Sequence, residues 1–163
     1  MIDAEVQALA TRVLAAARAR KWMIATAESC TGGLVAGALT EIAGSSDVVD
    51  RGFVTYSNQA KMALVGVPEA TLAAHGAVSR QTAEAMAKGA LERAGVDLTV
   101  AITGIAGPGG GSAEKPVGLV HFAAAAKDGR LIHREKRYGD VGRSEVRRLS
   151  VIEALSMLHD LAA

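Results

Sequence analysis

Residues 23–33 read MIATAESCTGG, so an apolar run ends at hydroxyls and glycines, and an apolar, helix-compatible segment over 34–42 follows at once. This order predicts a buried strand, a short polar loop and a helix start. Backbone N–H groups at a helix start point toward one place, where the helix dipole is positive, so such a loop suits a phosphate or a developing oxyanion. An ordinary helix start capped by Ser29 or Thr31 explains the same spacing equally well.

The remainder of the chain alternates between segments typical of helices and of strands. Apolar residues at helical spacing, with capping residues or glycine at the ends, predict helices over 3–20, 31–43, 58–65, 68–75 and 80–94, and a last helix from about Gly142. Residues that favour strands predict strands over 22–27, 47–57, 97–103, 117–126 and 131–138. Asp128-Gly129 indicates a hairpin between the last two strands. We therefore expect a single domain over residues 1–163 with an α/β fold, in which a mixed β-sheet has helices on both faces as a three-layer α/β/α sandwich.

The composition disfavours several classes of partner. The chain has 163 residues, with 18 Lys and Arg against 17 Asp and Glu, and only two Phe, two Tyr and one Trp. Balanced charge and few aromatic rings argue against nucleic acid and against an anionic membrane surface. The single cysteine, Cys30, rules out an internal disulfide and a multi-cysteine zinc site. With no long apolar span and no basic, apolar leader, we expect a soluble, cytoplasmic protein.

A second strand-to-glycine junction lies at Gly104–Ser112. It lacks the Gly-Lys-Ser/Thr of a phosphate-binding P-loop, and no Gly-x-Gly-x-x-Gly opens a helix after a strand. Backbone N–H groups in this loop could still hold a phosphate or a sugar, whereas a flexible hairpin loop explains the glycines equally well.

The four histidines are scattered, without the spacing of a metal site, so we expect no metal. A nucleophilic Cys30 with a histidine partner is an alternative, because a helix start lowers a thiol pKa. A small buried thiol is the simpler interpretation of Cys30.

Hydroxyl groups and one lysine remain at the predicted ends of elements: Ser29, Thr31, Tyr56, Ser57, Lys61 and Thr103. A nucleophilic serine needs a base, and a lysine can serve when burial and a helix start lower its pKa. Lys61 falls in the first turn of the predicted helix 58–65. An exposed surface lysine is the ordinary alternative.

Four segments occur in an order that resembles a known family: AESCTGG at 27–33, TYSNQAK at 55–61, GAVS at 76–79 and TGIAGPGG at 103–110. Together they resemble the C-terminal domain of the CinA (competence/damage-inducible protein) family. The resemblance extends from the first helix to the last. The chain resembles the short form of the family, which lacks the N-terminal molybdopterin-binding-like domain of longer members. This short form deamidates nicotinamide mononucleotide.

The resemblance implies a role for particular residues. Ser29 would be the nucleophile, Lys61 its base, and Tyr56 a hydroxyl in the same proton network. The residues implied to bind the substrate are Cys30, Thr31, Gly32, Thr103, Gly104, Gly107 and Arg143. The implied substrate is a pyridine nucleotide, converted to nicotinic acid mononucleotide and ammonia without a metal or cofactor.

Two other functions fit the same sequence. A non-catalytic nucleotide-binding or regulatory module would use the glycine loops without turnover, and a cysteine amidase would use Cys30. We also expect a homo-oligomer, but no motif in the sequence specifies the number of subunits.

Overall fold

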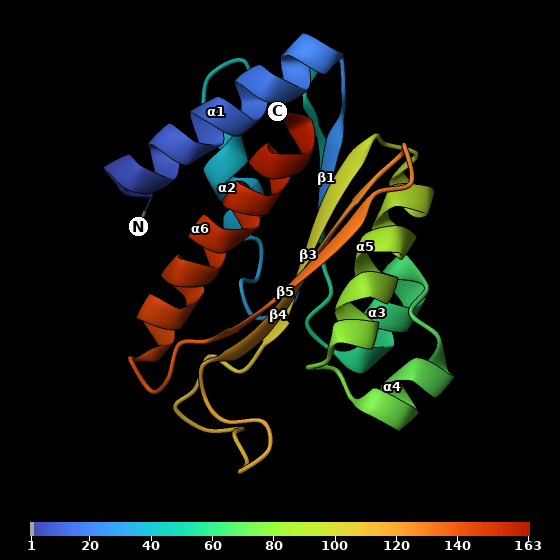
Figure 1. Cartoon of the computed structure of the whole chain (residues 1–163), viewed down its shortest axis with the longest axis vertical. Helices are drawn as coiled ribbons and strands as arrows, with labels where there is room; N and C mark the ends of the chain where they lie inside the picture. The colour runs from blue at the N-terminus through green and yellow to red at the C-terminus, as the bar shows by residue number, and fades with distance from the viewer. Residues whose placement is uncertain (1) are drawn as a thin grey trace.

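The structure, a computed structural model, describes residues 2–163 as a five-stranded sheet between two groups of helices (Figure 1). The strands lie in the order β2 (Val49–Val54), β1 (Ile24–Glu28), β3 (Leu98–Gly104), β4 (Leu119–Ala126) and β5 (Leu131–Arg137). β1 pairs in parallel with β2 and β3, whereas β4 is antiparallel to both β3 and β5. The prediction of a mixed sheet in an α/β sandwich is confirmed.

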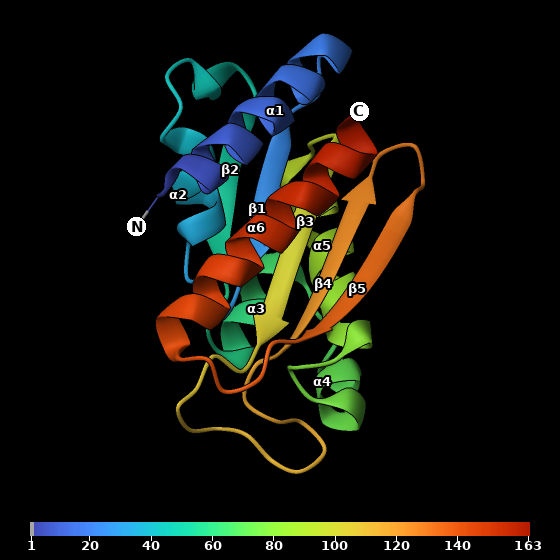
Figure 2. The ribbon, with the colours of Figure 1, turned by 60° about the vertical axis from the view of Figure 1, so that its left-hand side comes forward.

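The helices divide between the two faces of the sheet. α1 (Ala4–Arg20), α2 (Leu34–Thr40) and α6 (Arg143–Ala162) lie on one side, and α3 (Asn58–Val65), α4 (Glu69–His75) and α5 (Arg80–Ala94) on the other (Figure 1). α1 and α6 cross the sheet side by side (Figure 2). None of the helices within residues 2–163 has the length and apolar character needed to cross a membrane.

Each face of the sheet has its own apolar core, because successive side chains of a strand point to opposite faces. Val100 and Ile102 of β3 pack in the cluster beneath α1 and α6, whereas Ala101 belongs to the cluster beneath α5. α3 in turn packs very closely on α5 at Gly89, where an added Cβ would lie 1.7 Å from the carbonyl oxygen of Val65. The close approach at Gly89 fixes α3 against the α5 layer.

The parallel strands end at one edge of the sheet, which is where the polar loops gather. β2 and β3 lie on opposite sides of β1, and the helices that connect these strands lie on opposite faces. Such a reversal opens a crevice at the carboxyl ends of the strands, the usual ligand site of open α/β sheets. The loops after β1, β2 and β3 and the start of α6 meet at this edge (Figure 2).

The second helix is shorter than the expected 31–43, since α2 spans Leu34–Thr40. Gly32 and Gly33 have φ angles of 56° and 103°, which an α-helix cannot include. The residues before Leu34 are therefore a turn that links the end of β1 to α2.

Candidate active site

Ser29 and Lys61 lie in hydrogen-bonding contact at the edge of the sheet. Lys61 Nζ is 2.9 Å from Ser29 Oγ and donates a second hydrogen bond of 2.9 Å to the carbonyl oxygen of Thr55. Ser29 directly follows β1, and Lys61 lies on the inward face of α3, a helix capped by the Ser57 side chain at the amide of Ala60. A serine hydroxyl and a lysine amine are thus held together from two separate chain segments.

The environment of Lys61 favours the neutral amine. Lys61 keeps only 1 % of its accessible surface, and within residues 2–163 it forms no salt bridge with a carboxylate. Burial lowers the pKa of Lys61 below its ordinary value of 10.5, and the nearby Cys30 opposes this effect to a lesser extent. A neutral amine keeps a lone pair, so Lys61 can accept the proton of the Ser29 hydroxyl.

Cys30 lines the same cavity as Ser29, but its thiol is not the reactive form. It is buried, and this burial raises the pKa of its thiol to about 12. At neutral pH the thiol is protonated, whereas the nucleophilic form of cysteine is the thiolate. The geometry therefore favours Ser29 over Cys30 as a nucleophile.

Ser29 and Lys61 open into a cavity of about 210 Å³. Seven of the residues expected at the site line it: Ser29, Cys30, Tyr56, Lys61, Thr103, Gly104 and Arg143. The other lining residues are Asn58, Ala77, Val78 and Ala106, which were not predicted individually but lie in the motif segments 55–61, 76–79 and 103–110. The cavity wall is therefore built from the ends of all three parallel strands together with α3 and α6.

The end of β3 forms the floor of the cavity. Thr103 is buried, and its hydroxyl donates to the carbonyl oxygen of Ala77 at 2.8 Å, which holds the 76–79 segment against the strand. Gly104 is needed for close approach, because a Cβ there would lie 2.7 Å from Val120 Cγ2 and 2.9 Å from the carbonyl oxygen of Leu119. Any larger residue at 104 would push β4 away from the end of β3.

Tyr56 and Arg143 lie together at the mouth of the cavity. The Arg143 guanidinium donates to the Tyr56 hydroxyl at 3.0 Å and to the carbonyl oxygen of Gly107 at 2.9 Å. Tyr56 is 62 % exposed. Among residues 2–163 the hydroxyl of Tyr56 has no hydrogen bond to Ser29 or Lys61, so its expected part in their proton network stays a prediction. Gly107 reaches the site only through its carbonyl contact with Arg143.

Thr31 and Gly32 do not line the cavity, and their expected part in substrate binding stays a prediction. Thr31 is fully buried, and its hydroxyl donates to Glu28 Oε1 at 2.7 Å. Gly32 faces α6, where an added Cβ would lie 3.4 Å from Arg147 Nη2. The turn after Ser29 directs these two residues toward the α6 layer instead of the strand ends.

Glu28 occupies the start of α2, where we expected an anion to bind. Its Oε1 accepts from the amides of Gly33 and Val35, and its Oε2 accepts from the amide of Ala36, at 2.9 to 3.2 Å. The hydroxyls of Thr26 and Thr31 also bond to this carboxylate. These amides are therefore unavailable to a phosphate or oxyanion, and Glu28, not Ser29 or Thr31, caps the helix.

The sequence does contain a signal for Glu28. A carboxylate at the end of an apolar strand has to find donors, and alternation along β1 puts Glu28 on the same face as Ile24 and Thr26, beneath α2. Thr55 has no comparable signal, because its contribution is a backbone carbonyl that holds Lys61 Nζ.

Replacing Glu28 with Gln is expected to destabilise the fold by about 3 kcal/mol, because an amide cannot accept from donors at both of its heavy atoms and leaves buried N–H groups unpaired. Thr31→Val removes one donor only, so its effect should be about 1 kcal/mol. Urea denaturation of both variants measures the difference. Equal, small losses would show that the carboxylate does not cap α2.

The histidines give no site at this edge. His121 on β4 and His133 on β5 approach each other, with His121 Nδ1 2.9 Å from His133 Nε2, and neither lines the cavity that contains Ser29. Within residues 2–163, no cluster of three or more His, Cys, Asp or Glu side chains is arranged to hold a metal ion.

The fold is that of an open α/β sheet protein, with a buried serine–lysine pair at the carboxyl ends of the parallel strands. The family model of the CinA C-terminal domain matches residues 6–162. This chain belongs to the CinA C-terminal domain family.

Two curated relatives and one crystal structure are especially similar. Nicotinamide-nucleotide amidohydrolase PncC of Escherichia coli (strain K12) is 52 % identical over 159 residues, which are 97 % of this chain and 95 % of that protein. PncC of Enterobacter agglomerans is 53 % identical over 138 residues, 85 % of this chain and 84 % of that protein. The crystal structure of competence/damage inducible protein CihA from Agrobacterium tumefaciens has a TM-score of 0.98 and 58 % identity, and covers 100 % of this chain and 99 % of that one.

Proposed function

We propose that this protein is a nicotinamide-nucleotide amidohydrolase, which converts nicotinamide mononucleotide to nicotinic acid mononucleotide and ammonia. The observation that carries the proposal is the 2.9 Å contact between the buried Lys61 amine and the Ser29 hydroxyl. The two PncC relatives bear the name of this activity and align over most of their length.

In the first half of the reaction, Ser29 Oγ attacks the carboxamide carbon while its proton passes to Lys61 Nζ. The carbonyl of Thr55 holds one N–H of the amine, which helps to direct the lone pair of Lys61 toward the hydroxyl. The carbon–nitrogen bond then breaks, Lys61 returns its proton to the leaving nitrogen, and ammonia departs. A nicotinoyl ester of Ser29 remains.

In the second half, water attacks the ester carbon and Lys61 takes a proton from that water. The bond to Ser29 Oγ breaks, and Lys61 gives the proton back to the serine oxygen. Each half begins and ends with a neutral lysine, so the lowered pKa of Lys61 fits both steps.

The oxyanion needs donors, and the start of α2 is already bonded to Glu28. The amides of Cys30 and Thr31 have no hydrogen-bond acceptor within residues 2–163, and they follow the nucleophile directly. Thr31 is fully buried and lies outside the cavity, so we assign the oxyanion to the amide of Cys30, which lines the cavity next to the nucleophile.

The size of the cavity suggests how a mononucleotide would lie. About 210 Å³ is less than the roughly 300–1,000 Å³ typical of pockets that enclose a whole ligand. The nicotinamide ring would therefore enter the cavity, while the ribose and phosphate lie at its mouth. Arg143 and the loop that contains Gly107 are the donors nearest to that phosphate.

Arg143→Ala is expected to raise KM about tenfold and to change kcat much less, because a phosphate contact is made equally in the ground state and the transition state. Initial rates of ammonia release over a range of nicotinamide mononucleotide concentrations give both constants. Arg12→Ala, an exposed arginine on α1, is the matched control. A loss of kcat at unchanged KM would instead connect Arg143 to the reacting atoms.

The direct test is ammonia release from nicotinamide mononucleotide by the purified protein. Turnover that yields equal amounts of ammonia and nicotinic acid mononucleotide supports the proposal. Saturable binding of nicotinamide mononucleotide without ammonia release would mean that the chain is a nucleotide-binding module instead.

A further inference from the structure

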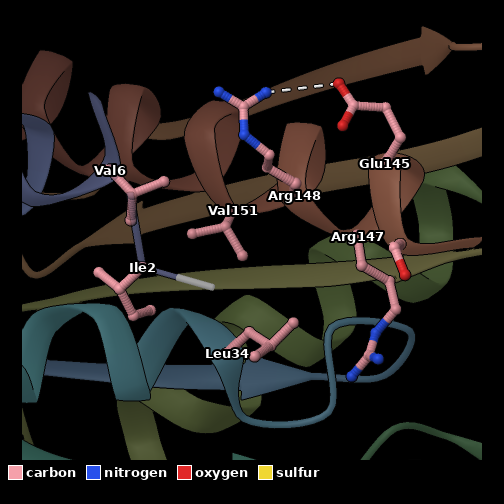
Figure 3. Close-up of a pocket in the computed structure, with 8 residues that line it drawn as sticks. Ile2, Val6, Leu34, Glu145, Arg147, Arg148 and Val151 are labelled. Carbon is pink, nitrogen blue, oxygen red and sulfur yellow. Dashed lines mark hydrogen bonds and ion pairs between the residues drawn. The ribbon is translucent and has the colours of Figure 1, made fainter. Parts of the chain in front are cut away.

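A second cavity lies in the helical layer of α1, α2 and α6, away from the one that contains Ser29. Its volume is about 360 Å³, within the roughly 300–1,000 Å³ typical of ligand pockets. Four aliphatic side chains converge on it, from Ile2, Val6, Leu34 and Val151 (Figure 3). The two cavities have no lining residue in common, so the second one is a separate site.

One arginine of this second cavity has unused hydrogen-bonding capacity. Arg147 donates from Nε to the carbonyl oxygen of Cys30 at 3.1 Å, and its two Nη atoms have no acceptor within residues 2–163. The side chain is half-buried, and its guanidinium lies beside the turn that precedes α2 (Figure 3). A guanidinium with two free nitrogen atoms is a ready partner for a planar carboxylate.

The other arginine of the cavity is already neutralised. Arg148 forms ion pairs with Asp3, Glu5 and Glu145. Three carboxylates surround this one guanidinium, so the net charge around Arg148 is negative. Arg147 is the only cation lining the cavity that has no carboxylate partner within residues 2–163. The three carboxylates repel a phosphate dianion more strongly than a monoanion, so a single carboxylate is the better partner for Arg147.

We propose that this cavity binds a small organic monocarboxylate with an apolar body. The carboxylate pairs with the free Nη atoms of Arg147, and the aliphatic or aromatic body packs on Val6, Leu34 and Val151. Apolar lining with one well-placed polar group is the usual composition of a small-molecule site.

The site is connected to the catalytic loop by the same guanidinium. Arg147 Nε holds the carbonyl of Cys30, which is the residue after Ser29. A carboxylate that fixes the Arg147 guanidinium therefore also fixes the turn that carries the nucleophile. Occupancy alters the turnover number of the proposed reaction without competing with the substrate.

Hexanoate and its neutral analogue 1-hexanol are the probes for the test. Titration of the full chain, followed by amide and methyl NMR shifts, should give saturable hexanoate binding with the largest shifts at Val6, Leu34 and Val151. 1-Hexanol should bind at least about tenfold more weakly, because it cannot form the charged pair with Arg147. Shifts confined to Ala77 and Thr103 would mean that hexanoate enters the other cavity, and would overturn the proposal.

Three variants separate the parts of the site. Arg147→Gln should weaken hexanoate binding about tenfold, and Glu145→Gln should strengthen it, while neither changes 1-hexanol binding. Leu34→Phe, which fills the apolar part, should weaken both probes, with thermal denaturation confirming that the variant folds. Hexanoate binding that is unchanged in Arg147→Gln overturns the proposal, as does purely competitive inhibition of ammonia release. The binding measurements need no catalysis, so they stand even if the proposed activity fails.

Discussion

Ser29→Ala is expected to reduce ammonia release from nicotinamide mononucleotide by about 10⁴-fold or more, because no nucleophile remains to form the ester. Within residues 2–163 the lost hydroxyl bonds only to Lys61, so the cost to the fold should be small. Turnover is measured as ammonia produced per enzyme, with circular dichroism to verify the fold.

Cys30→Ala is the matched control, since it changes the adjacent residue on the same turn. It should keep most of the activity, because burial raises the pKa of the Cys30 thiol to about 12 and holds it protonated. An inactive Cys30 variant beside an active Ser29 variant would reverse the assignment of the nucleophile.

Lys61→Arg should lower kcat by roughly 10²–10⁴-fold, because a guanidinium keeps its proton and cannot act as a base. Lys61→Ala should be similarly impaired, and a small added amine should restore part of its rate. Lys88→Arg, at an exposed lysine on α5, is the control and should behave like the wild type. An arginine variant with near wild-type turnover would make Lys61 a binding cation and leave the base unassigned.

The pH dependence of the wild type follows from the same group. The reaction needs the unprotonated amine, so kcat/KM should rise with pH through the pKa of Lys61 and then level off. Burial lowers that pKa, so the midpoint of the rise should lie below the ordinary lysine value of 10.5. Rates from about pH 6 to about pH 10 test this, and the rising limb should be absent in Lys61→Ala.

Much of the fold could be predicted from local sequence. The spacing of apolar residues predicted the strands and most helices, and Asp128-Gly129 predicted the hairpin between β4 and β5. These signals act within one segment of the chain. The resemblance to the CinA family, not the order of the elements, implied that Ser29, Thr103 and Arg143 share a site, and the three residues line one cavity.

Other parts of the site depend on contacts between distant segments. Thr31 and Gly32 were expected to bind substrate, and their positions outside the cavity are set by Glu28 beneath α2 and by Arg147 on α6. The burial of Lys61 could not be derived from spacing, because it requires α3 to dock on α5. The expected homo-oligomer stays a prediction.

The serine and the lysine belong to opposite helical layers. Ser29 leads into α2 on one face of the sheet, while Lys61 is carried by α3 on the other, and the sheet edge is where they meet. Catalytic competence thus depends on both layers being docked at the same time, and a state with one layer detached would hold a solvated lysine of ordinary basicity. A partly folded chain would therefore lack the proton acceptor of the proposed reaction, and folding itself would switch the activity on.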